Sequence, residues 1–417
     1  MKALLTHIAF VLIMPCLMAQ NIKDEIINYS YAQLPLQPLN REIKNFNSYI
    51  EAPYEAENKK QLAAYEQSKV DAKVAYDKAM ITYTQQLKAA DVQYAKDMEA
   101  WEKKSTGNKI VEKTLLGANT KPVKQSVYPP AAPYVAPPVL RSSYDYTTLA
   151  NTYINLGGYA RDTANAVQII VTLYGLDYTL PRQQSVVKDM VRSANGQTQS
   201  YKATYYYTEF SYRHPMAVKV YDPAGKELLI ATPQELNNYK IYKTAESENP
   251  PTINQELLIK TYEEKVLQDN LTFINKMVND KFGYALVNRK TNLYYVKSKD
   301  GLYADLLLAF NEADAGLKTL VADAATAKPK ITTAIQAWEK ALTESEPTNK
   351  KARIDNDVTI AICFNLLEGY FALGDVFHAE NIIKKMNTLD LSGDERKTKV
   401  GYELLFADFK KRISSQN

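Results

Sequence analysis

The chain has 417 residues, of which 51 are Lys or Arg and 47 are Asp or Glu, and its net charge is +4. This near balance does not indicate a nucleic-acid partner, because such proteins present strongly basic surfaces. Tyrosine is abundant, with 31 residues, and its rings bury while its hydroxyls stay hydrated, which indicates wide, half-wet apolar surfaces. The length predicts two or three domains, and the patterns below predict an α+β fold.

Residues 1–19 predict export. One lysine precedes an apolar run, and the small residue Ala19 stands just before polar sequence, which is the pattern of a secretory signal peptide. We expect cleavage after Ala19, leaving Gln20 first. Cys16 raises a lipoprotein alternative, but Pro15 precedes it where a lipobox has a small residue. No later segment is long and apolar enough to predict a membrane span, so at most peripheral membrane association is expected.

Residues 20–53 predict short N-terminal strands. Prolines at three positions exclude a long helix, and apolar side chains alternate around Tyr29–Tyr31 and again over Phe46–Ile50.

Residues 54–106 predict one long amphipathic helix. No Pro or Gly occurs from Tyr54 to Lys104. Six aromatic residues recur at spacings of 7 and 11, which places them on one side of a helix that turns by about 100° per residue. They are Tyr54, Tyr65, Tyr76, Tyr83, Tyr94 and Trp101, here called the tyrosine stripe. The helix is coiled-coil-like, would form a rod of about 75 Å, and has to project beyond a small domain.

Residues 107–143 predict an extended return from the end of the rod. The stretch "KPVKQSVYPPAAPYVAPPV" forces polyproline-like backbone. We hypothesise that it lies along the tyrosine stripe, because proline rings pack well on tyrosine faces. The alternative cover is another chain, including self-association through the rod. Tyr83, Tyr94 and Trp101 are therefore candidate contact residues, provided that the return segment leaves them uncovered.

Residues 144–300 predict a β-rich domain with an inserted helix. Alternating strands flank the turn "DPAG", and the inserted helix has Thr252 as its candidate N-cap and Gly283 after its end. The stretch "YALVNRKTNLYYVKS" predicts a hairpin that extends the same β domain. His214, beside Pro215 at a predicted strand break, is interpreted as a structural polar residue.

Residues 301–417 predict a helical domain, which resembles a tetratricopeptide repeat. The stretch "NLLEGYFALGDVFHAENIIKKM" has small and apolar residues at that motif's helix-turn-helix spacing, and "AIQAWEKAL" is similar to part of a preceding repeat. The residues concerned are Leu366, Tyr370, Gly374, Ala379 and Ile383, with Ala334, Trp338 and Ala341 upstream. The resemblance implies stacked helical hairpins whose concave side contacts a partner protein.

The whole chain is also similar to a class of secreted and envelope proteins of Bacteroidota. The similarity lies in "YSYAQLPLQPL", the long Ala/Tyr/Lys helix and "FSYRHPMAVKVYDPAGKELL". It implies a Gram-negative envelope and no specific activity. In that setting "DTA" at 162–164 marks Thr163 as a candidate O-glycosylation site. The helical, basic C-terminus is unlike a surface-sorting signal, so we expect the periplasm or the outer-membrane periphery.

The sequence indicates no catalytic, cofactor or metal site. It has no P-loop, dinucleotide fingerprint, CxxC or HExxH motif. Cys363 falls on the apolar side of a helix and is interpreted as a buried hydrophobe. Asp390, Ser392 and Asp394 resemble a cation loop only vaguely, and a turn with an N-cap accounts for them better.

We therefore expect a non-enzymatic scaffold or adaptor that contacts unknown envelope proteins through its rod and its tetratricopeptide-like module. Two alternatives stay open. A glycan- or peptidoglycan-binding module would expose a row of rings, for example within Tyr205–Tyr212. A carboxylate-dependent cell-wall hydrolase would place two Asp or Glu side chains roughly 5–10 Å apart in a cleft.

Overall fold

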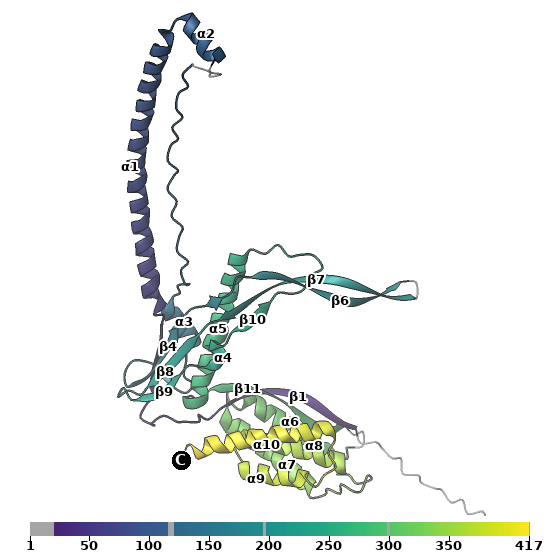
Figure 1. Ribbon diagram of the computed structural model, residues 1–417. Coiled ribbons are helices and arrows are strands. Elements are labelled where there is room, and N and C mark those ends of the chain that lie inside the picture. Colours follow the sequence, from purple (N-terminus) through teal and green to yellow (C-terminus); the bar gives the residue numbers. More distant parts are fainter. Residues whose placement is uncertain (1–20, 116–120, 195–196, 298–300, 417) are drawn as a thin grey trace, which may run out of the picture.

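The computed structural model describes residues 21–115, 121–194, 197–297 and 301–416. The predicted signal peptide, with Cys16, Ala19 and Gln20, lies outside these residues. The fold is α+β, as predicted, with a long helix near the N-terminus and a bundle of helices at the C-terminus. Figure 1 shows three parts: a central β body from which an arm projects, a helical rod, and a helical module that contains the C-terminus.

The body is built on a mixed five-stranded sheet in the order β3-β2-β4-β8-β9. The stretch "AVQIIVTL" forms its central strand, and six of its eight residues are buried, as expected for a strand with cover on both faces. Helices α3 and α5 pack against this sheet. The elements are β2 (Asn45–Glu51), β3 (Ala160–Arg161), β4 (Ala166–Leu173), β8 (Met216–Tyr221), β9 (Glu227–Ala231), α3 (Tyr146–Tyr153), α4 (Gln234–Asn237) and α5 (Gln255–Phe282).

The ends of α5 fit their caps. Gly283 follows the last residue, as predicted, but the N-cap is Asn254 and not Thr252. The Asn254 side chain accepts a hydrogen bond from the amide of Leu257, three residues further on, which is the spacing that an N-cap requires. Thr252 lies two residues earlier and does not have this spacing.

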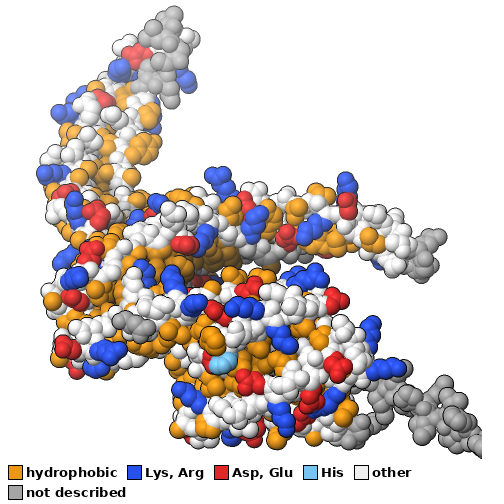
Figure 2. Space-filling model, turned by 90° about the horizontal axis from the view of Figure 1, so that it is seen from below, with side chains coloured by type: hydrophobic (Ala, Val, Ile, Leu, Met, Phe, Trp, Pro, Cys, Tyr) orange, Lys and Arg blue, Asp and Glu red, His pale blue; other side chains and the backbone are white. Residues whose placement is uncertain are grey.

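The arm is a long antiparallel ribbon of two strands. β6 (Arg182–Ala194) pairs with β7 (Gln197–Arg213) along its whole length, and β5 (Asp177–Tyr178) and β10 (Lys240–Lys243) pair only with the base of β7. Phe210 and Tyr212 anchor that base against α5. Figure 2 shows the arm standing out beside the helical module, with apolar and charged side chains interspersed along it.

The helical module includes two strands, one that precedes the body in the sequence and one that follows it. β1 (Asn21–Ala32) pairs antiparallel with β11 (Leu286–Lys297), and this ribbon packs on the helices. The prediction that residues 284–298 form a hairpin of the β body is therefore wrong, since Leu286–Lys297 form one strand whose partner lies near the N-terminus. The helices are α6 (Ala304–Thr319), α7 (Ala324–Leu342), α8 (Asn356–Leu373), α9 (Val376–Met386) and α10 (Gly393–Ser414).

Module and body are fastened together by the end of α10. The Arg412 guanidinium, which is buried, donates to the Leu34 carbonyl and pairs with Asp280 at the end of α5. Gln33 and Leu36 add backbone hydrogen bonds to Ala285 and Asp280. Three distant segments thus meet at one junction.

The rod consists of α1 (Tyr54–Glu102), α2 (Thr106–Leu115) and a return segment of irregular backbone from 121 to 145. The return segment runs back beside α1 (Figure 1). The Asn58 side chain exchanges two hydrogen bonds with the Arg141 backbone near the base, and Lys124 pairs with Asp91 farther out. The predicted extended segment 107–143 is wrong at its start, because residues 106–115 contain no proline and continue as helix α2.

The pairing of β1 into the helical module predicts that two neighbouring isoleucines differ in their effect on stability. Ile27 is 2% exposed and belongs to the core of the module, whereas Ile26 is 54% exposed. Ile27→Ala should cost about 2–4 kcal/mol of unfolding free energy, because it leaves a cavity. Ile26→Ala should cost less than about 1 kcal/mol. Denaturant titration followed by the fluorescence of buried Trp338, in a Trp101→Phe background, measures both. Equal effects would contradict the pairing.

Candidate functional site

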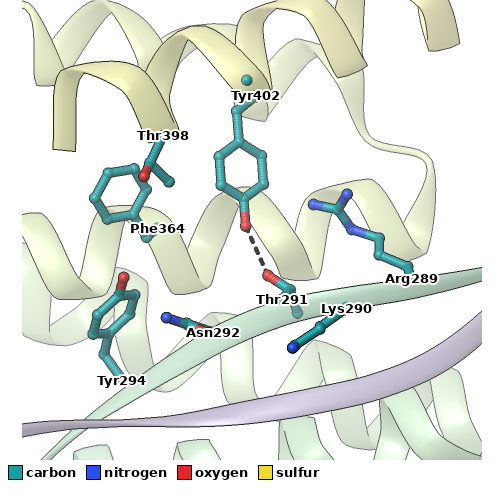
Figure 3. Close-up of a pocket in the computed structure, with 9 residues that line it drawn as sticks. Arg289, Lys290, Thr291, Asn292, Tyr294, Phe364, Thr398 and Tyr402 are labelled. Atoms are coloured by element: carbon teal, nitrogen blue, oxygen red, sulfur yellow. Dashed lines mark hydrogen bonds between the residues drawn. The ribbon is translucent and has the colours of Figure 1, made fainter. Parts of the chain in front are cut away.

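A cleft of about 350 Å³ opens between β11, α8 and α10. Its volume falls within the range of about 300–1,000 Å³ that is usual for ligand sites. Figure 3 shows side chains from the strand and from both helices converging on it. The lining residues are Arg289, Lys290, Thr291, Asn292, Tyr294, Phe364, Thr398, Gly401 and Tyr402.

One carboxylate is buried behind this cleft. Glu368 of α8 is fully buried and accepts two hydrogen bonds from Arg289, at 2.6 and 2.7 Å. The hydroxyls of Tyr402 and Thr291 donate to it at 2.6 and 3.0 Å, and the Tyr29 hydroxyl donates as well. Side chains of β1, β11 and α10 thereby all donate hydrogen bonds to one carboxylate on α8.

These contacts keep Glu368 ionised. Burial alone would raise the pKa of this carboxyl, but the hydrogen bonds and charge of Arg289 and the tyrosine hydroxyls lower it below the ordinary value. Burial and the adjacent Glu368 raise the pKa values of Tyr29 and Tyr402 well above their ordinary range. A carboxylate that is surrounded by donors and held in its charged form links the elements that donate to it. It is poorly suited to donate a proton.

The wall of the cleft is aromatic and its rim is small and polar. The Tyr294 and Phe364 ring centroids are 6.0 Å apart, and those of Phe364 and Tyr402 are 6.1 Å apart with an interplanar angle of 28°. On α10, Thr398 and Gly401 face the opening, and a Cβ added to Gly401 would meet no atom within 4 Å. The cleft can therefore take a ligand that combines apolar contact with hydrogen bonding.

The candidate contact residues of the rod lie away from the cleft, on α1. Tyr83, Tyr94 and Trp101 are half-buried on the side of the helix that follows the tyrosine stripe, and the Lys109 ammonium lies 4.2 Å from the Trp101 ring centroid. The return segment runs beside α1 (Figure 1), and each of these rings is half-buried. They were candidates on condition that the return segment leaves them uncovered; since the structure leaves each ring partly exposed, their role in contacts stays a prediction.

The structure places the other predicted residues apart from one another. Thr163 is exposed in the loop between β3 and β4, where a glycan has room. Cys363 is buried in α8, and burial raises its pKa to about 12. Ser392 caps α10 through a capping box with Glu395, as the turn interpretation predicts. Within 205–212 every residue is buried or half-buried, so the row of exposed rings that a glycan-binding face requires is absent there.

Sequence reasoning missed the Glu368 cluster. The available signal was a single glutamate in the apolar run "ICFNLLEGYF", because a charge in such a run requires a buried partner. The partner, Arg289, lies on another element and could not be identified from spacing. Among the residues that the structure describes, no three His, Cys, Asp or Glu side chains are grouped as a metal site would require.

Comparison of the chain with protein-family models, with curated proteins and with solved structures finds no match. The tetratricopeptide-like and Bacteroidota resemblances therefore stay predictions. In the described part of the chain, no helix combines the length and the apolar character needed to cross a membrane.

The Glu368 cluster predicts a large effect of one conservative change. Glu368→Gln removes the charge that Arg289, Tyr29 and Tyr402 surround, and should lower the unfolding free energy of the helical module by about 3–5 kcal/mol. Glu380→Gln on α9 is the control, because the Lys410–Glu380 pair is exposed on both sides and is worth about 1 kcal/mol or less. Chemical denaturation followed by Trp338 fluorescence distinguishes them, and a Glu368→Gln protein as stable as the wild type would contradict the assignment.

His214 predicts a pH dependence for the body. Its ring is buried, neither nitrogen has a hydrogen-bond partner among the described residues, and burial lowers its pKa to about 4. Below the ordinary histidine pKa of about 6.5, only the unfolded chain takes up this proton, so stability should fall by up to about 3 kcal/mol between pH 6.5 and 4. His214→Leu should flatten this part of the stability profile, as measured by urea titration at each pH. An unchanged profile would show that His214 does not titrate there.

Proposed function

We propose that this protein is a non-enzymatic scaffold or adaptor of a bacterial envelope, acting through protein–protein contacts of its rod and helical module. One observation carries the proposal: the rod extends far from the body without contributing to its cores. Beyond Tyr54 at its base, no described residue of α1 belongs to the hydrophobic clusters of the body or the module. A helix of 49 residues that contributes to these clusters only at its base is suited to reaching a partner far from the body.

The rod also presents an apolar row to solvent. Val70, Val74, Ile81 and Val92 are between 48% and 61% exposed, and their spacings of 4, 7 and 11 place them within about 40° of one another on the helix. This row, here called the valine row, lies about 160° around the helix from the tyrosine stripe, on the side away from the return segment. A regular row along a projecting rod favours a contact with another protein over scattered surface hydrophobes.

The helical module supports the same proposal. Helices α8 and α9 form a hairpin in which Gly374 takes a left-handed turn, with φ of 79°, and Ala379 is fully buried where the two helices meet. These are the roles that the tetratricopeptide resemblance implies for those residues. The signal-peptide pattern of residues 1–19 supports the envelope location.

The proposal predicts that partner capture depends on the valine row. In Val74→Glu/Ile81→Glu, crosslinking in the envelope followed by affinity purification should lose the partner protein recovered with the wild type, because two buried charges disfavour the contact. The thermal midpoint should change little, since both residues are exposed in the free protein.

Val123→Glu is the matched control, because Val123 is an exposed valine of the return segment that lies outside the row. It should retain the partner. Undiminished capture by the double variant, or recovery of peptidoglycan fragments in place of protein, would contradict the proposal.

A further inference from the structure

The cleft exposes the unpaired edge of strand β11. Tyr294 exchanges two hydrogen bonds with the side chain of Asn365, from its amide at 2.8 Å and to its carbonyl at 2.7 Å, so both of its backbone groups point away from β1. In an antiparallel pair, the residues whose backbone groups point outward alternate along the strand. The β1–β11 register is continuous, and Asn292 and Lys290 therefore point their amides and carbonyls the same way as Tyr294.

Asn365 thus makes the hydrogen bonds that a neighbouring strand would make, but only at Tyr294. Its amide group satisfies Tyr294 as a strand backbone would, and the edge beside it continues into the cleft at Asn292 and Lys290. The described residues supply no backbone partner for those two positions. Two outward positions span roughly 7 Å of strand, which is room for about three residues of an added chain.

The charge of the edge selects the sequence of that chain. β11 carries Arg289, Lys290 and Lys297 and no acidic residue. Arg289 is committed to Glu368, and Asn292 donates its side chain to Asp24 of β1. Lys290 is exposed, and the described ion pairs include none to it, so a carboxylate on the added chain has a free cation to meet.

We propose that this cleft binds an extended, acidic peptide segment of a partner protein by adding it as a strand to the edge of β11. The peptide backbone pairs with Lys290 and Asn292, one of its side chains packs against Phe364 and Tyr402, and an acidic side chain pairs with Lys290. This inference rests on the proposed adaptor function and specifies the kind of partner that the helical module takes.

Gly401 provides a specific test. It lies in the middle of α10 and lines the cleft, and a side chain added there would enter open space. Gly401→Leu fills the cleft while its higher helix propensity favours the same fold. Gly393→Leu is the matched control, because Gly393 also belongs to α10, has open space around it and does not line the cleft.

The probe is a fluorescein-labelled peptide of alternating valine and glutamate, about eight residues long, long enough to cover the edge. Fluorescence anisotropy with the full chain should show binding that weakens at least about tenfold in Gly401→Leu and stays within about twofold in Gly393→Leu. Methylating alternate backbone nitrogens of the peptide should abolish binding, and replacing glutamate by lysine should weaken it.

The outcomes separate this inference from the proposed function. Binding that is equal in Gly401→Leu and the wild type, or that survives backbone methylation, overturns it, as does the absence of binding at about 1 mM peptide. In that last case Lys290 and α10 only shield the strand edge from aggregation. The Val74→Glu/Ile81→Glu protein should bind the peptide normally, so failure of the rod proposal leaves this result unaffected.

Discussion

Strands β1 and β11 pair in a continuous antiparallel register, from Asn21 opposite Lys297 to Ala32 opposite Leu286. Through this ribbon a segment near the N-terminus completes the core of the C-terminal helices. Closing so long a loop costs conformational entropy, which the burial of Ile27 and Tyr29 and the hydrogen bonds to Glu368 offset. As a result, the body, the rod and the arm are all inserted in the sequence between two paired strands of the helical module.

In that arrangement the parts that project from the body are not needed to build the core of the helical module. The rod is joined to its return segment near its base through Asn58 and Arg141, and the rings of the tyrosine stripe are half-buried. A helix of 49 residues is long enough for its backbone hydrogen bonding to persist once it has nucleated. The outer side of the rod can therefore present the valine row without weakening the cores, because those side chains belong to none of them.

Local patterns predicted local structure well. The absence of Pro and Gly from Tyr54 to Lys104 predicted one helix, and Gly283 and Ser392 predicted where helices end and begin. The same reasoning failed wherever a distant partner decides. Residues 284–298 have the alternation of a strand, but no local feature shows that β1 is their partner. Glu368 was visible as a misplaced charge, whereas its five donors come from three other elements.

The cleft was hidden for the same reason. Its polar groups are backbone atoms of β11, which every residue possesses, and only the register with β1 and the position of Asn365 show which of them point outward. Such a site leaves no motif, because the sequence contributes mainly a gap at Gly401 and a cation at Lys290.

Residue-resolved amide hydrogen exchange along β11 tests the central claim, that β1 completes the helical module and leaves one edge of β11 open. The account predicts slow exchange at Arg289, Thr291 and Leu293, which face β1, and at Tyr294, which Asn365 protects, with fast exchange at Lys290 and Asn292. Uniformly fast exchange from Leu286 to Lys297 would contradict the pairing. Slow exchange at Lys290 and Asn292 as well would show that another part of the chain already covers the edge.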